Sequence, residues 1–358
     1  MRTILGIVGA RPNFIKMAPV IDALRQRPGV RTLLVHTGQH LDPAMSDVIF
    51  QELGLPAPDL HLGVGTLSPW AQAARIIEAC GDLIARERPD WVVVPGDVNS
   101  TLAGAVAAVR TGTRLAHLES GLRSFDRSMP EELNRIATDH LADRLYVTEP
   151  SGLRNLRREG IPDERIRSVG NTMVDTLRRS QPHAQARRVD IEPDGPFILM
   201  TVHRPHTVDN FAGLQRLCAI LEQVIQTAPV VFPVHPRTRR RLHEHGLAEN
   251  LERLPELRLV DPLGYLDFLA LMLRARIVMT DSGGIQEETT ALGVPCLTLR
   301  PNTERPITCE VGTNRVVGTD PAAVAAALRE FWESPPQGQL PEGWDGQAAQ
   351  RVADDLLG

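Results

Sequence analysis

The sequence predicts an α/β protein made of two Rossmann-like, doubly wound domains that face a central cleft. Three observations lead to this prediction. Short apolar and β-branched runs alternate with segments of helical period from end to end, as in parallel-sheet proteins. The chain has 358 residues, more than a single hydrophobic core accommodates. A polar stretch with three prolines, residues 181–196, interrupts the alternation as a linker does.

Each half of the chain supplies one domain. Strands are expected at 3–8, 32–36, 91–94, 115–117, 145–147 and 166–169, and helices at 14–25, 69–86, 101–110, 131–141 and 150–159. In the second half, strands are expected at 197–201, 230–232, 257–260, 277–280 and 295–298, and helices at 211–227, 238–246, 265–273, 284–292 and 321–332. The expected domains are 1–180 and 196–340, joined by a linker at 181–195 and followed at 341–358 by a helix that could pack on either domain, the N-terminal one included.

The composition excludes several classes of function. Apolar residues make up 42% and charged residues 23%, so the chain is not disordered. A net charge of -5 and 4% aromatic residues provide neither a basic surface nor a stacking platform for nucleic acid. The four widely spaced cysteines (Cys80, Cys218, Cys296 and Cys309) indicate a reducing compartment. No apolar run is long enough for a membrane span or signal peptide, so we expect a cytoplasmic protein without membrane contacts.

Chemically active side chains follow the predicted strands directly. The carboxyl ends of the strands form the ligand-binding edge of an open α/β sheet. Three acids, Asp97, Glu119 and Glu131, and the histidine His203 fall at such positions. A single acid or histidine there is more often a cap or a surface group. Three acids at one edge favour general acid–base chemistry.

The familiar nucleotide and metal motifs do not occur. Gly6-x-x-Gly9 is not the G-x-G-x-x-G of dinucleotide sites, and the second strand ends in His36-Thr37 without an acid for a ribose. The sequence contains no P-loop motif and no D-x-D pair, which argues against a P-loop kinase and a metal-dependent sugar transferase of the single-domain kind. We therefore expect no NAD, no metal and no other cofactor.

Residues 281–288, Asp-Ser-Gly-Gly-Ile-Gln-Glu-Glu, are the sharpest local signal. Ser282, Gly283 and Gly284 present backbone N–H groups at a strand-to-helix junction, which suits a diphosphate. Glu288, one helical turn further on, is placed to accept both hydroxyls of a ribose. The alternative is an N-cap serine with turn glycines and solvated glutamates.

With these residues assembled, the sequence resembles the non-hydrolysing UDP-N-acetylglucosamine 2-epimerases over nearly its whole length. The motifs that carry the resemblance are Gly9-Ala-Arg-Pro with Lys16, His36-Thr-Gly-Gln-His40, Gly96-Asp97, His117-Leu-Glu-Ser-Gly-Leu-Arg123, Pro130-Glu-Glu-Leu-Asn-Arg135, Val169-Gly-Asn-Thr172, His203-Arg204, His235-Pro-Arg-Thr238, residues 281–288 and Glu304-Arg-Pro306. That family is similar in fold to the two-domain glycosyltransferases of GT-B type, which agrees with the predicted layout.

The resemblance implies a role for each candidate residue and a homodimeric assembly. The UDP-sugar substrate would be bound by Arg11, Lys16, Leu263, Phe268, Ser282, Gly283, Gly284, Glu288 and Arg305, with the diphosphate on Ser282, Gly283 and Gly284, the ribose on Glu288, and the uracil between Phe268 and the backbone of Leu263. The family's catalytic positions match Asp97, Glu119, Glu131 and His203. Some members also carry a regulatory substrate site, which would use Gln39, Arg204 and His235.

The implied reaction is the reversible epimerisation of UDP-N-acetylglucosamine at C2. Because the C2 hydrogen is not acidic, UDP leaves C1 first, and a carboxylate then removes the C2 proton to give a 2-acetamidoglucal. Re-addition of UDP with proton delivery to the opposite face inverts C2. Two protonic groups are therefore needed, and positioned acids or bases typically contribute about 100- to 10,000-fold each. Cationic and helix-end groups at the departing diphosphate contribute the larger share.

Two departures from the family pattern leave the substrate open. Asn13 stands where the first motif usually has Glu, and His203-Arg204-Pro205-His206 replaces His-Arg-Arg-Glu. Losing two carboxylates could favour a more anionic sugar, UDP-2,3-diacetamido-2,3-dideoxyglucuronate. Alternatively, Asn13 caps the first helix and the second change only reshapes a loop. A two-domain glycosyltransferase and a non-catalytic nucleotide-sugar sensor are the remaining alternatives.

Overall fold

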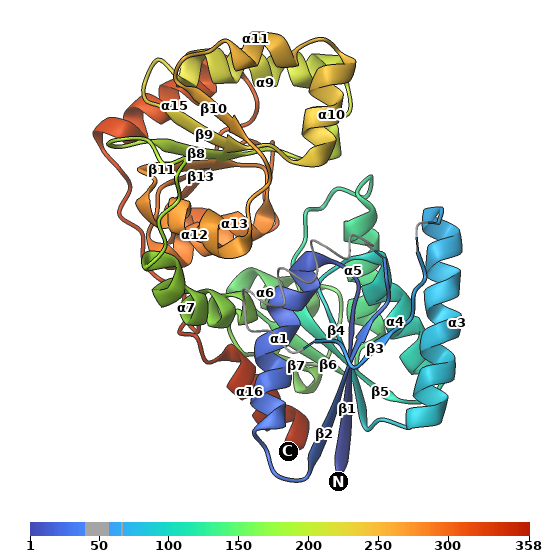
Figure 1. Ribbon diagram of the computed structural model, residues 1–358. Coiled ribbons are helices and arrows are strands. Elements are labelled where there is room, and N and C mark those ends of the chain that lie inside the picture. The colour runs from blue at the N-terminus through green and yellow to red at the C-terminus, as the bar shows by residue number, and fades with distance from the viewer. Residues whose placement is uncertain (40–56, 66) are drawn as a thin grey trace. The chain divides into compact units, whose positions relative to one another are not determined.

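The structure is a computed structural model and describes residues 1–39, 57–65 and 67–358. The chain divides into two compact units (Figure 1). Unit 1 comprises Met1–Arg179 together with Glu342–Gly358, and unit 2 comprises Ser180–Pro341. Within the described ranges, no helix is both long and apolar enough to cross a bilayer.

Unit 1 is built on a seven-stranded parallel sheet in the order β3-β2-β1-β4-β5-β6-β7. The strands are β1 (Arg2–Val8), β2 (Val30–His36), β3 (Leu60–His61), β4 (Trp91–Pro95), β5 (Arg114–Ser120), β6 (Arg144–Val147) and β7 (Ile166–Ser168). The helices are α1 (Arg11–Arg25), α3 (Pro69–Glu87), α4 (Asn99–Arg110), α5 (Pro130–Leu141), α6 (Pro150–Arg158) and α16 (Ala348–Leu357), with a 3₁₀ turn at Asp163–Arg165. A further helix, α7 (Thr172–Gln185), begins in unit 1 and ends in unit 2. On one face α1 packs beside α16, and on the other α3, α4 and α5 pack in a row (Figure 1).

Unit 2 repeats the design with a six-stranded parallel sheet in the order β10-β9-β8-β11-β12-β13. The strands are β8 (Ile198–Thr201), β9 (Val230–Pro233), β10 (Leu257–Val260), β11 (Ile277–Thr280), β12 (Cys296–Thr298) and β13 (Asn314–Val316). The helices are α8 (Pro205–Val208), α9 (Phe211–Val224), α10 (Pro236–Glu244), α11 (Ala248–Glu252), α12 (Tyr265–Arg274), α13 (Gly283–Leu292), α14 (Ile307–Glu310) and α15 (Pro321–Glu333).

Each face of the unit 2 sheet packs against a hydrophobic core of its own, so the strands carry apolar side chains on both faces. Ile198 and Met200 enter the core that α9 and α15 cover. Leu199, between them, enters a second core with Leu271 and Met272 of α12. Successive side chains of a strand point to opposite faces, so both of these core faces must be apolar. This explains the continuous apolar runs that the sequence shows.

All the predicted strands and helices are present, with ends that differ by at most three residues. The sequence analysis did not anticipate β3, β13, α7, α8, α11 and α14. The two strands have only two and three residues and lie at sheet edges. Segments this short do not develop the periodic pattern on which sequence prediction depends.

The expected linker at 181–195 is wrong at its beginning, because α7 continues through Gln185 and carries Pro182 inside it. A proline removes one helical hydrogen bond. Ala184, two residues later, is fully buried, so the segment packs against the protein as a helix beyond the proline.

The C-terminal helix α16 belongs to unit 1, where it packs against α1. Asp175 of α7 holds its first turn, since the carboxylate accepts hydrogen bonds from the N–H groups of Ala348 at 3.2 Å and Ala349 at 2.7 Å. Burial raises the pKa of Asp175 to about 6, although these two hydrogen bonds act in the opposite direction. A buried carboxylate thus serves as the N-terminal anchor of the helix.

Candidate active site

The carboxyl ends of β1, β4 and β5 form one continuous edge in unit 1, because these strands are neighbours. Asn13 connects two of them. Its Oδ1 accepts hydrogen bonds from the N–H groups of Gly9 at 3.1 Å and Ala10 at 3.2 Å, and its Nδ2 donates to the carbonyl of Pro95 at 3.0 Å. Asn13 therefore caps α1, and its neutral amide suits a position that needs both an acceptor and a donor.

Lys16 and Glu119 form a buried ion pair at this edge. Lys16 lies in α1 and Glu119 near the end of β5, and their side chains are 8% and 6% exposed. Gly96, directly before Asp97, lies against this pair, since a methyl group there would come within 3.2 Å of Lys16 Nζ. The structure thus brings together two of the predicted site residues, Lys16 and Glu119, and places Gly96, the neighbour of Asp97, beside Lys16.

Asp97 is held by helix α5. Its carboxylate forms an ion pair with Arg135. Its backbone carbonyl accepts a hydrogen bond from Asn134 Nδ2 at 2.9 Å. The Asp97 side chain is 21% exposed, so it is fixed by its neighbours and still reaches the surface.

The first turn of α5 carries two adjacent glutamates with different surroundings. Glu132 is buried and accepts hydrogen bonds from the N–H groups of Ser124 at 2.9 Å and Phe125 at 3.0 Å. Glu131, the predicted catalytic acid, is half-buried. Glu132 therefore secures the loop after β5, whereas Glu131 lies at the surface of the same turn.

A buried pair lies beneath this edge, and the sequence analysis did not include it among the site residues. His117 of β5 lies 2.7 Å from Asp139 of α5 through Nδ1 and 2.7 Å from the carbonyl of Gly96 through Nε2. Both side chains are fully buried. Asp139 follows Arg135 by four positions, which puts both on one side of α5. This spacing could have placed Asp139 near the site, but it does not identify His117 as its partner.

In unit 2, α13 begins directly after β11 with Ser282 as its N-cap residue. The N–H of Ser282 donates to Thr280 Oγ1 at 3.0 Å. The guanidinium of Arg305 lies against Gly283, so a side chain at this position would displace it, since a Cβ there would lie 2.3 Å from Nη1 of Arg305. A cation therefore lies beside the positive end of α13, an arrangement that suits an anion.

Arg305 is held by two buried carboxylates. Its Nε lies 3.1 Å from Glu287, and its Nη1 lies 3.4 Å from Glu304. Glu304 also pairs with both Nη atoms of Arg300, at 2.9 and 2.8 Å. Burial would raise the pKa of Glu304, but Arg300 and Arg305 outweigh it and lower that pKa far below its usual range, with a smaller contribution from Arg204.

The other predicted nucleotide residues lie in α13, in α12 and just before α12. Glu288 is buried and accepts a hydrogen bond from the hydroxyl of Tyr265 at 2.9 Å, a contact that the sequence analysis missed. Leu263 and Phe268 are half-buried and pack on the core beneath α12. Gly284 occupies the second position of α13.

His203 is oriented by Asp281, the first residue of the 281–288 motif. The fully buried Asp281 accepts hydrogen bonds from the N–H groups of His203 at 2.9 Å and Arg204 at 2.7 Å, and its other oxygen lies 3.2 Å from His203 Nδ1. Burial lowers the pKa of His203, and the charges of Arg204 and Arg237 act in the same direction. The charge of Asp281 acts in the opposite direction but is outweighed. The ring of His235 lies 5.4 Å from that of His203.

The remaining predicted residues fall in both units. Arg11 is the first residue of α1. Gln39 accepts hydrogen bonds from Ser100 N at 2.9 Å and Ser100 Oγ at 2.6 Å in unit 1. Arg204 and His235 begin α8 and α10 of unit 2 as their N-cap residues. His40 of the motif at 36–40 and the side chain of His206 lie outside the described residues.

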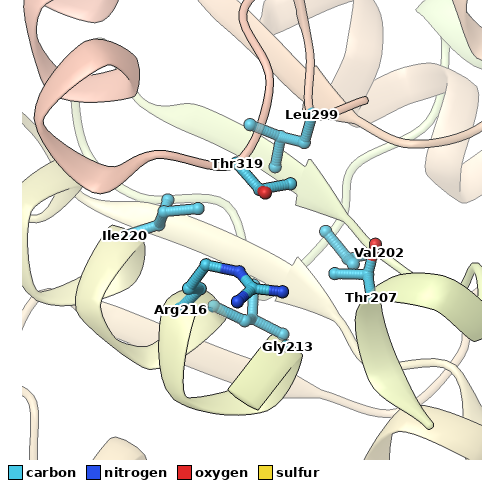
Figure 2. A pocket seen from close by; sticks show the side chains of 8 residues that line it. Val202, Thr207, Gly213, Arg216, Ile220, Leu299 and Thr319 are labelled. Atoms are coloured by element: carbon cyan, nitrogen blue, oxygen red, sulfur yellow. The ribbon is translucent and has the colours of Figure 1, made fainter. Parts of the chain in front are cut away.

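Two hollows lie away from these side chains. One, of about 30 Å³, is in unit 2 between α9 and the ends of β8 and β12, with Val202, Arg216 and Leu299 in its lining (Figure 2). It has room for about one water molecule. The other, of about 540 Å³, is open and lies at the amino ends of β4 and β5, the sheet edge opposite the acids. Among the residues that the structure describes, no three His, Cys, Asp or Glu side chains are grouped as metal ligands.

Comparison with known proteins identifies the family. The sequence profile described as UDP-N-acetylglucosamine 2-epimerase matches residues 22–357. The chain belongs to this family. A UDP-N-acetylglucosamine 2-epimerase of Methanococcus maripaludis is 39% identical over 360 residues, which cover 98% of this chain and 97% of the relative. A UDP-2,3-diacetamido-2,3-dideoxy-D-glucuronate 2-epimerase of Pseudomonas aeruginosa is also 39% identical over 360 residues, with 99% of each chain covered.

Solved structures agree with the epimerase family. The crystal structure of the Methanocaldococcus jannaschii UDP-GlcNAc 2-epimerase in complex with UDP-GlcNAc and UDP has a TM-score of 0.90 and 37% identity, and the match covers 99% of both chains. The predicted family and the predicted α/β fold with two parallel sheets are confirmed. The assignment of individual residues to catalysis and binding stays a prediction.

Proposed function

We propose that this epimerase interconverts UDP-N-acetylglucosamine and UDP-N-acetylmannosamine. The observation that carries the proposal is the carboxyl edge of unit 1, where Glu119 is paired with Lys16 and Asp97 with Arg135. A chain of this family needs carboxylates in fixed positions for proton transfer at C2. Both pairs lie where adjacent strands end, the usual place for a substrate in a doubly wound sheet.

The nucleotide is proposed to bind to unit 2. The N-terminus of α13, with Gly283 open to the guanidinium of Arg305, offers N–H groups and positive charge to a diphosphate. Glu288, one turn further on, is oriented by Tyr265 and accepts the ribose hydroxyls. Leu263 and Phe268 supply the apolar surface for the uracil.

In the proposed reaction the C1–O bond breaks first, and the bonding electrons leave with UDP. The sugar gains oxocarbenium character, so the C2 proton becomes acidic, and a carboxylate removes it to form the C1–C2 double bond of the glucal. Return of UDP to C1 with delivery of a proton to the opposite face of C2 completes the inversion. Asp97, Glu119 and Glu131 supply the proton transfers, and His203 interacts with the leaving phosphate.

No nicotinamide and no metal are proposed to take part. Departure of UDP makes the C2 proton acidic, so no oxidised sugar has to be formed to activate it. Turnover should therefore survive removal of divalent ions by EDTA. A loss of activity that added metal restores would contradict this part of the proposal.

Proton NMR of UDP-N-acetylglucosamine and enzyme in deuterated water tests the proposal. Without any acceptor, the C2 signal of the substrate should disappear as UDP-N-acetylmannosamine forms, because the abstracted proton exchanges with solvent. Epimerisation with full retention of protium would contradict the elimination route. Binding without turnover would indicate a nucleotide-sugar sensor, and turnover only with an added acceptor would indicate a glycosyltransferase.

The diacetamidoglucuronate is the second candidate substrate, because relatives with either specificity are equally similar, at 39% identity. The hydrogen bonds of Asn13 support UDP-N-acetylglucosamine as the substrate. Its Oδ1 caps α1 and its Nδ2 donates to the end of β4, which accounts for this departure from the family pattern without any change in the sugar. The ratio of kcat/KM for the two UDP-sugars, in wild type and in Asn13→Glu/His206→Glu, decides between them. A preference for the uronate that the double variant abolishes would favour the second candidate.

We further propose that the protein is a cytoplasmic homodimer. A regulatory UDP-sugar site is proposed at Gln39, Arg204 and His235. The cysteines of the described residues are free thiols, in keeping with a reducing compartment. Light scattering of the purified chain tests the dimer. Initial rates against UDP-N-acetylglucosamine concentration test the regulatory site, since a simple hyperbola would argue against it.

A further inference from the structure

Glu119 has a backbone conformation that glutamate rarely adopts. Its φ is 67°, in the left-handed region, where Cβ crowds the backbone. The pairing of β5 with β6 shifts register between Leu118 and Ser120, which makes Glu119 the extra residue of a β-bulge. A bulge redirects the side chain that it carries, and here that side chain is the one paired with Lys16. Something in the surroundings must therefore hold the bulge in place.

A single carboxylate spans the bulge. Asp139 accepts a hydrogen bond from the N–H of Gly121 at 3.0 Å and lies 2.7 Å from His117 Nδ1. These partners lie two residues after and two residues before Glu119. Asp139 also lies 2.7 Å from Nη1 of Arg123. From a fully buried position, it fixes both flanks of Glu119.

His117 connects Asp139 to the end of the neighbouring strand, β4. Its Nε2 lies 2.7 Å from the carbonyl of Gly96, the residue before Asp97. His117 therefore contacts Asp139 through one ring nitrogen and the carbonyl of Gly96 through the other. One buried pair thus connects the turns that carry two predicted catalytic acids.

The charge of Asp139 is compensated within the network. Burial would raise the pKa of Asp139, but the hydrogen bond and charge of His117, with the guanidinium of Arg123, outweigh it and lower that pKa. Arg123 is paired in turn with Glu159, at 2.8 and 2.6 Å. Asp139 therefore remains an acceptor, and it does not itself reach the surface to act on a substrate.

We propose that Asp139 is a positioning residue, which holds Glu119 in its left-handed conformation and, through His117, fixes the turn of Asp97. The inference rests on the proposed function, because it gives Asp139 a part in the reaction at C2. Small displacements of reacting groups are costly, and about 1 Å can reduce turnover by about 100-fold. The effect of losing Asp139 should therefore fall on turnover and leave UDP-sugar binding nearly intact.

Steady-state kinetics of Asp139→Ala and Asp139→Asn test this, with Asp143→Asn as a matched control. Asp143 accepts the N–H of Leu115 at 2.8 Å, so the control exchanges a hydrogen-bonded carboxylate for an amide at the other end of β5. Asp139→Ala should lower kcat by about 100-fold with KM within about threefold. Asp139→Asn keeps an acceptor for the N–H of Gly121 and should therefore lower kcat by less than Asp139→Ala does. The control should keep wild-type kcat.

Hydrogen exchange of the peptide 117–123 gives a second readout, independent of activity. Asp139→Ala should lose amide protection there, whereas Asp143→Asn should keep it. Wild-type kcat in both Asp139 variants of an active enzyme, or protection lost throughout unit 1, would overturn the inference. If Asp139→Ala does not fold, Asp139→Asn provides both readouts. A wild-type chain that turns over neither UDP-sugar would refute the proposed function instead, and exchange in 117–123 would still decide whether Asp139 holds the bulge.

Discussion

Replacing Asp175 by asparagine should make unit 1 more stable at neutral and alkaline pH. Burial raises the pKa of Asp175 from 3.8 to about 6 in the folded protein. The folded state therefore binds more protons than the unfolded state between these values, and the free energy of unfolding falls as the pH rises through this window. The difference of about two pKa units corresponds to about 3 kcal/mol, which is lost by pH 7. Asparagine is uncharged, as the protonated acid is, so the variant does not lose this stability as the pH rises.

The measurement is urea unfolding of wild type and Asp175→Asn from pH 4 to pH 8, followed by tryptophan fluorescence. Trp344, shortly before α16, is fully buried and reports on this region. The variant should match wild type near pH 4 and exceed it by up to about 3 kcal/mol at pH 8. Asp345→Asn is the control of opposite sign, because the ion pair with Arg351 lowers the pKa of Asp345 and its contribution is lost as the pH falls. A stability difference that does not change with pH in Asp175→Asn would refute the reasoning.

Three further predictions concern the site. Asp97→Asn and Glu131→Gln should each lower turnover by at least about 100-fold and change UDP affinity only a few-fold, as measured by kinetics and calorimetry; an equal loss of affinity would indicate a binding role. Gly283→Ala should weaken UDP binding about tenfold or more in titration calorimetry, because the new methyl displaces Arg305 from its carboxylates, and unchanged affinity would contradict this role. Asp281→Asn should shift the His203-dependent limb of the pH–rate profile to lower pH, since a carboxylate that stabilises the imidazolium is removed; an unmoved limb would show that Asp281 does not act through His203.

The sequence predicted the elements whose signals are local. Strand and helix positions follow from apolar runs and helical period, and the junction at Ser282 follows from glycines between a strand and a helix. The acids at the strand ends could be found because parallel strands share one edge. These features depend on neighbours within a few residues.

Long-range partnerships could not be predicted in the same way. Nothing in a single sequence pairs Asp139 with His117, or Asp175 with the start of α16, because these contacts depend on how helices pack on sheets. The Tyr265–Glu288 bond joins α12 to α13 for the same reason. Burial, which distinguishes Glu132 from its neighbour Glu131, likewise appears only in the folded chain.

The discontinuous make-up of unit 1 has a consequence for biosynthesis. The helix α16, which covers α1, follows residues 180–341 in the chain, whereas unit 2 is one uninterrupted segment. Domains generally fold as units while the chain emerges from the ribosome. Unit 2 can therefore complete its core as soon as it has been synthesised. The face of α1 that packs against α16 is covered only later, because α16 lies more than 300 positions downstream. Closing so distant a contact is slow. The part of unit 1 that is made first can therefore be completed only after the rest of the chain has been synthesised.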